Sequence, residues 1–106
     1  MIASSKIRAL SNRIAEEFHP ERIILFGSHA RRQAREDSDV DLLVVMPFRG
    51  KGARKSVEIL NRVEPDFPVD VIVRTPRQMR ERLARSDFFL CEVVKNGKVL
   101  YEAAHP

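Results

Sequence analysis

A chain of 106 residues is long enough for one small domain, which would bury roughly 65% of the surface that its unfolded chain exposes. Hydrophobic residues make up 43% and charged residues 32%, and the absence of an apolar stretch of about 18–20 residues argues against a membrane span. The net charge of +4 suits an acidic partner, a phosphate ligand or a nucleic acid, and a solvated basic surface is the alternative. The N-terminal segment carries acidic residues and Cys91 is the only cysteine, so we expect a cytoplasmic protein without an internal disulfide.

Helical and strand patterns alternate along the first half of the chain. Apolar residues at helical spacing predict a first helix, with Ser4 or Ser5 as its cap and His19–Pro20 at its end. Two short runs of branched apolar residues predict buried strands, and a basic loop over 48–52 precedes another helix. The expected elements are a helix ending near 18, strand 22–26, helix 28–34, strand 40–46, and a helix ending near 63 with Val57, Leu60 and Val63 on one face.

The second half of the chain continues this alternation. Residues 75–78 resemble a capping box with proline at the first helical position. Residues 87–95 are apolar on nearly every side, which favours a core helix over a partner surface, and Asn96–Gly97 ends it. The expected elements are strand 69–73, a helix from Pro76 with Met79 and Leu83 together, helix 87–95 and edge strand 98–102. Strands that alternate with helices predict an α/β or α+β fold with a mixed β-sheet flanked by helices.

Three aspartates stand where strand cores should be apolar. Asp39 and Asp41 are two residues apart at the start of a strand, so they project in one direction, and Asp70 lies inside a later apolar run. Unpaired buried carboxylates are costly, and a cluster of them is tolerated when divalent cations neutralise it. Magnesium takes such oxygen ligands, so the three predict a metal site. A plain turn at Ser38–Asp39 is the alternative for Asp39 alone.

A Gly-Ser pair at a strand-to-helix junction adds a candidate phosphate site. Backbone N–H groups and the helix dipole at Gly27–Ser28 favour a phosphate, and glycine allows a close approach. Arg31 could reach phosphate oxygens, whereas Arg32 and His29 are expected to lie on the surface. The chain has neither a G-x-S-x-G hydrolase motif nor a Walker A loop, and no His/Cys spacing typical of zinc.

Taken together, these motifs resemble one known group of enzymes. Gly27–Ser28, ten further residues and then Asp39–Val40–Asp41 resemble the G-S-x10-D-x-D signature of polymerase-β-like nucleotidyltransferases. Within these enzymes the chain most resembles the minimal nucleotidyltransferase group, and the resemblance lies in residues 26–31, 38–42 and 69–71. Arg32 departs from the pattern, because many relatives have glycine there.

The resemblance implies a polymerase-β-like nucleotidyltransferase fold over a single domain, residues 1–106, and transfer of a nucleoside monophosphate from ATP. It implies that Asp39 and Asp41 bind two Mg²⁺ ions, and that Asp70 binds the catalytic ion and helps deprotonate the acceptor. Nucleotide binding is implied for Gly27 and Ser28, on the β- and γ-phosphates, and the same role is expected of Arg31 and Ser38. Two such ions would stabilise both oxygens of an in-line displacement.

The acceptor implied by the resemblance is a protein. Minimal nucleotidyltransferases are similar to antitoxins paired with a HEPN-type toxin, in which the transferase adenylylates a tyrosine of the toxin, and a hetero-oligomer with that toxin is then expected. Two alternatives stay open: an antitoxin that neutralises by binding alone, and a small-molecule transferase of the aminoglycoside type. A DNA-binding regulator is the weakest hypothesis, because no helix-turn-helix pattern is evident. We expect neither a membrane nor a direct nucleic-acid partner.

Overall fold

The computed structural model describes residues 1–104 and shows a four-stranded mixed sheet in the order β3-β2-β1-β4. β1 pairs antiparallel with both β2 and β4, while β2 pairs in parallel with β3. The predicted mixed α/β fold is therefore confirmed. The elements are α1 (Ser4–Phe18), β1 (Arg22–Phe26), β2 (Val40–Val45), α2 (Gly52–Val63), β3 (Val69–Arg74), α3 (Pro76–Ala84), α4 (Phe88–Asn96) and β4 (Lys98–Glu102).

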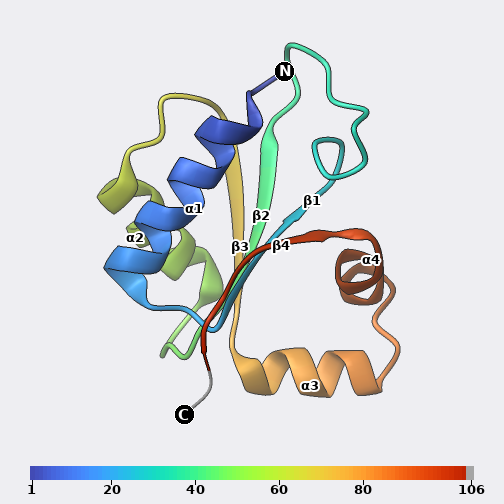
Figure 1. Cartoon of the computed structure of the whole chain (residues 1–106). Helices are drawn as coiled ribbons and strands as arrows, with labels where there is room; N and C mark the ends of the chain where they lie inside the picture. Colours follow the sequence, from blue (N-terminus) through green and yellow to red (C-terminus); the bar gives the residue numbers. More distant parts are fainter. Residues whose placement is uncertain (105–106) are drawn as a thin grey trace.

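Helices cover both faces of the sheet (Figure 1). α1 and α2 lie on one face, where Ile14, Ile59 and Val63 are fully buried against alternate residues of β2. α3 and α4 lie on the other face, where Met79 and Leu90 pack on the opposite set of strand residues. The central strand β2 is consequently apolar and buried on both sides, as its continuous hydrophobic run predicts.

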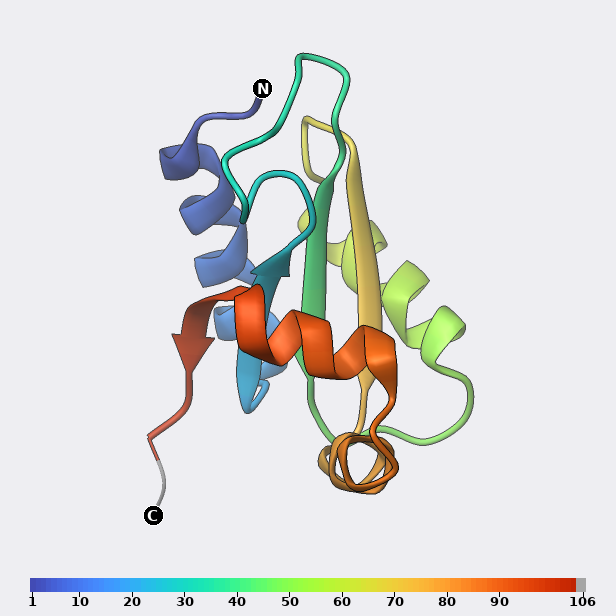
Figure 2. The same ribbon diagram turned by 90° about the vertical axis from the view of Figure 1, so that its right-hand side faces the viewer.

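Side chains cap two helices, and the first of these caps was predicted from its residues. Thr75 Oγ1 accepts a hydrogen bond from the Gln78 amide while the Gln78 side chain accepts one from the Thr75 amide, both at 3.0 Å, so the capping box is formed. Asp87 caps α4 by accepting from the Leu90 amide at 2.9 Å. The Asp87 cap lies at the corner where the chain passes from α3 into α4, which crosses the sheet in Figure 2.

Some local predictions are wrong. No side chain caps α1, whose first residues follow an extended Ala3 rather than a capping Ser4 or Ser5. Val57 does not lie on the inner face of α2 and is 57% exposed. The inner face instead carries the buried Ile59 and Val63, and Ser56 on α2 donates its hydroxyl to the Val71 carbonyl at 2.6 Å.

The helix predicted over 28–34 is also absent. Residues 28–32 make one helical turn, which closes when the amide of Gln33 donates to Ser28 O at 2.8 Å and the amide of Arg32 donates to His29 O at 3.4 Å. This pattern of two bonds is a Schellman motif, and Arg32 occupies its left-handed position with φ +58°. Many proteins of the group that the chain resembles have glycine at this position. Glycine adopts a positive φ without strain.

Candidate functional site

The candidate site lies at the end of the sheet where β1 finishes and β2 and β3 begin. In Figure 2 the connection from β1 to β2 arches over this end, while α4 crosses the strands below it. Because β1 is antiparallel to β2 and β3 is parallel to β2, the last residue of β1 and the first residues of β2 and β3 meet here. The sheet therefore brings the Gly-Ser turn and the aspartates together at one end of its strands.

Gly27 forms the first wall of the site. Its φ is +75°, a conformation that L side chains rarely adopt, and a Cβ added to it would overlap Asp41 Oδ2. The Asp41 carboxylate thus packs directly against the backbone of the turn, which only glycine permits. This contact joins the two halves of the predicted signature in space.

Asp41 and Asp70 are direct neighbours across the parallel strand pair. Asp41 of β2 is the register partner of Asp70 of β3, and on its other side it faces Phe26 of β1. Register partners point to the same face, so both carboxylates lie on the face that α3 and α4 partly cover. Asp39 comes just before β2 and, like Asp70, is exposed.

The charges of these groups act on one another. Burial raises the pKa of Asp41, and the nearby carboxylates of Asp70 and Asp39 raise it further. Electrostatic interactions with the ring of His29 and the guanidinium of Arg31 act in the opposite direction and lower the same pKa. Asp41 and the two carboxylates that act on it form an oxygen-rich, anionic setting of the kind that a hard divalent cation neutralises.

The residues fit a magnesium site in chemistry, although their side chains are not gathered into one. Within residues 1–104, no three Asp, Glu, His or Cys side chains lie close enough together to hold a metal ion. Asp41 is fixed against Gly27, whereas the exposed side chains of Asp39 and Asp70 are free to change rotamer on a nanosecond timescale. The donor set and the raised pKa of Asp41 are consistent with the predicted ligands.

The other predicted residues occupy the turn and the loop after it. Ser28 is half-buried, and Arg31 is exposed, with a charge that lowers the pKa of Asp41. Ser38 serves the loop itself, because its Oγ accepts from the Arg35 amide at 2.8 Å. Since only one helical turn follows Gly27, the helix-dipole part of the phosphate argument loses its basis, and the close approach at Gly27 remains.

Two features of the site were missed from the sequence. A pocket of about 250 Å³ lies between the Gly27 turn and α4, which contributes Phe89, Glu92 and Asn96. The Phe89 ring meets Phe26 edge-on, with 5.4 Å between centroids. The second feature is His29, which contacts the backbone of Asp39 rather than lying free on the surface. Neither contact has a sequence signal, because each depends on segments distant in the chain.

Comparison with known proteins identifies the family. The sequence model of the nucleotidyltransferase domain family matches residues 7–101 of this chain. The chain belongs to the nucleotidyltransferase domain family. The nucleotidyltransferase motif residues 27, 28, 39, 41 and 70 all fall inside the matched range. No curated protein matches the sequence.

Solved structures share the fold at low sequence identity. A Sulfolobus solfataricus protein assigned as a nucleotidyltransferase aligns with a TM-score of 0.62 and 19% identity, over 92% of this chain and 78% of its own. A toxin–antitoxin structure with AMP-PNP aligns with a TM-score of 0.57 and 20% identity, over 91% and 73%. The toxin–antitoxin MntA–HepT aligns with a TM-score of 0.52 and 17% identity, over 95% and 74%.

In the part of the chain that the structure describes, no helix is both long enough and apolar enough to cross a membrane.

Proposed function

We propose that this nucleotidyltransferase transfers AMP from ATP to a tyrosine of a cognate HEPN-type toxin, and so acts as a cytoplasmic antitoxin. The observation that carries the proposal is the contact between the Gly27 turn and the Asp41 carboxylate, with Asp70 beside it in register. A phosphate chain held at the turn would lie next to the carboxylates, as adenylyl transfer requires.

The proposed chemistry assigns a task to each residue. Gly27 and Ser28 hold the β- and γ-phosphates, and Arg31 and Ser38 help to bind the nucleotide. Asp39, Asp41 and Asp70 would hold Mg²⁺, which when bound neutralises the charge on the phosphates. Asp70 takes the proton of the acceptor hydroxyl, whose oxygen bonds to the α-phosphorus as the bond to the β-phosphate breaks and pyrophosphate leaves.

An exposed apolar surface supports a protein as the acceptor. Phe88 is 83% exposed, and Phe89 and Val94 are each 41% exposed, although Leu90 and Val93 of the same helix are buried. α4 therefore has a core face and also an apolar outer face of the kind found at interfaces. Among structures with the same fold, the toxin–antitoxin complexes have a protein partner, and one was solved with AMP-PNP. A hetero-oligomer with the toxin is part of the proposal.

A second candidate is neutralisation by binding alone, which the same surface of α4 also favours. A small-molecule transferase is the third, and it needs an acceptor pocket such as the one of about 250 Å³ beside Gly27. The three differ in where an adenylyl label would appear and in whether the carboxylates are required.

The decisive experiment incubates the protein with labelled ATP, Mg²⁺ and the product of the neighbouring gene. Transfer of label to a tyrosine of that partner supports the proposal, and transfer should disappear in the double variant Asp39→Asn, Asp41→Asn. Full neutralisation of the toxin by the double variant would instead support binding alone. Label on an aminoglycoside or another small alcohol, with none on the partner, would support the small-molecule enzyme.

A further inference from the structure

The ring of His29 bridges two backbone groups that lie far apart in the sequence. The amide N–H of Ile2 donates to Nε2 at 3.3 Å, and Nδ1 lies 3.1 Å from the carbonyl oxygen of Asp39. His29 directly follows the Gly27–Ser28 pair, so one side chain links the N-terminal segment, the turn and the first aspartate of the signature.

These two partners determine where the ring carries its proton. A backbone amide can only donate and a carbonyl can only accept, so Nε2 must be the acceptor and Nδ1 must carry the hydrogen. His29 is therefore assigned as the neutral tautomer protonated on Nδ1. The alternative tautomer would place two acceptors and two donors face to face and would lose both bonds.

The bond to Asp39 fixes a whole peptide plane. The carbonyl of Asp39 and the amide of Val40 belong to the same peptide unit, and that amide donates to the Pro68 carbonyl at 3.0 Å. The unit is thus held from one side by His29 and from the other by the segment that leads into β3, which carries Asp70. Because this peptide plane is held, ψ of Asp39 is restricted. The direction of the Asp39 Cα–Cβ bond is therefore restricted as well.

We propose that His29 is a positioning residue for Asp39. It keeps the peptide after Asp39 in register with the phosphate-binding turn, so that the exposed Asp39 carboxylate reaches the same nucleotide and Mg²⁺ as Asp41. This inference rests on the proposed function for its effect on catalysis, and on the geometry alone for the tautomer and the peptide contact.

Three variants separate the two hydrogen bonds. His29→Asn keeps a donor near the place of Nδ1, His29→Gln keeps an acceptor near the place of Nε2, and His29→Ala keeps neither. We expect the alanine and glutamine variants to need about tenfold more Mg²⁺ for half-maximal ATP binding, a loss of about 1.4 kcal/mol. The asparagine variant should recover most of that affinity. His19→Asn, which removes an exposed histidine at the end of α1, should leave binding unchanged.

The measurements are calorimetric titration with ATP and Mg²⁺, thermal unfolding, and ¹⁵N NMR of the histidine rings without ligand. In the transfer reaction, the kcat of His29→Ala should fall, with a smaller change in KM for the partner protein. The His29→Asn variant should restore kcat. A ring protonated on Nε2, or equal Mg²⁺ dependence for alanine and asparagine variants, would overturn the inference. Failure of wild-type protein to transfer AMP would contradict the proposed function instead, since the tautomer and binding results do not depend on transfer.

Discussion

Gly27 is the position where one added methyl group tests the arrangement of the site. Alanine there must keep φ at +75°, which costs an L-residue about 1–2 kcal/mol, and its Cβ would overlap Asp41 Oδ2. Turning the Asp41 side chain off its rotamer adds roughly 0.5–1.5 kcal/mol. We therefore expect Gly27→Ala to lower the free energy of unfolding by about 2–3 kcal/mol and to displace the Asp41 carboxylate.

Gly50 offers a matched control. Its φ is +85°, and nothing lies within 4 Å of a Cβ added to it. Gly50→Ala should therefore show only the backbone cost of about 1–2 kcal/mol. Since 1 kcal/mol changes the Tm of a domain of this size by roughly 4–8 °C, the two variants should be distinguishable by thermal unfolding.

Binding of ATP with Mg²⁺, followed by calorimetry, gives the second comparison. Gly50→Ala should bind as the wild type does, whereas Gly27→Ala should lose at least about tenfold in affinity, or about 1.4 kcal/mol. If both alanine variants bind equally well, the contact between the turn and Asp41 does not build the nucleotide site. The reasoning that joins the two halves of the signature would then be refuted.

Other residues give independent tests. Because burial and the other aspartates raise the pKa of Asp41, its ionised form destabilises the fold above that pKa, and Asp41→Asn should raise the Tm near neutral pH without Mg²⁺. That gain should vanish below about pH 3, where the wild-type carboxyl is protonated in both folded and unfolded chains. Arg32→Gly should stabilise by about 0.5–1 kcal/mol in denaturant unfolding, because glycine accepts φ +58° without strain. Phe88→Asp should weaken toxin binding in a pull-down or calorimetry, while Val57→Asp, at another exposed apolar position on the opposite face, should not. Thr75→Ala should cost about 1 kcal/mol of stability in thermal unfolding through loss of the capping box.

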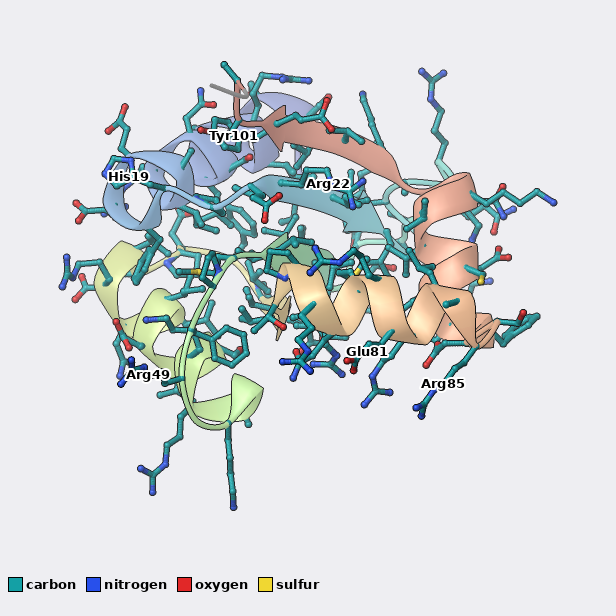
Figure 3. All side chains as sticks on the ribbon, turned by 90° about the horizontal axis from the view of Figure 1, so that it is seen from below. His19, Arg22, Arg49, Glu81, Arg85 and Tyr101 are labelled. Atoms are coloured by element: carbon teal, nitrogen blue, oxygen red, sulfur yellow. The ribbon has the colours of Figure 1, made fainter. Side chains whose placement is uncertain are left out.

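The basic helix α3 packs against α4, so it bears on the chemistry that the proposed protein partner would need. Arg77 pairs with Glu81 at 3.1 Å and Arg82 pairs with the half-buried Asp87 at 3.4 Å, and ion pairs near the surface contribute little to stability. Figure 3 shows Arg85 projecting from the end of α3 away from the sheet. A protein that covers Phe88 would therefore meet arginine side chains, so acidic residues on the partner would complement this face.

Strands and caps were predictable from the sequence because their signals are local. The runs 22–26 and 69–73 contain the residues that pair in the sheet, and Thr75 and Gln78 cap each other across three residues. The helix over 28–34 could not be excluded in the same way. Its end depends on Arg32 adopting a left-handed conformation that its residue type disfavours, so propensity pointed to a longer helix.

Contacts of the site that cross the fold were beyond local patterns. The spacing of the sequence signature identified the aspartates as candidate site residues. It could not show that Asp41 packs on Gly27, because this contact depends on the antiparallel register of β1 and β2. The wall formed by α4 comes from residues about sixty positions later in the chain. His29 binds backbone groups 27 residues before it and 10 after it, and backbone groups are the same for every sequence.

The mixed sheet itself is what makes the site possible. An antiparallel β1–β2 pair places the end of one strand beside the start of the next, which brings Gly27 to Asp41. Had β3 also run antiparallel to β2, Asp70 at its start would lie at the opposite end of the sheet. The α2 crossover returns the chain to the same end, so β3 starts there in parallel and Asp70 becomes the register partner of Asp41. The packing of Ile59 and Val63 beneath the strands thus supports the site from the other face, since it holds the crossover that sets the direction of β3.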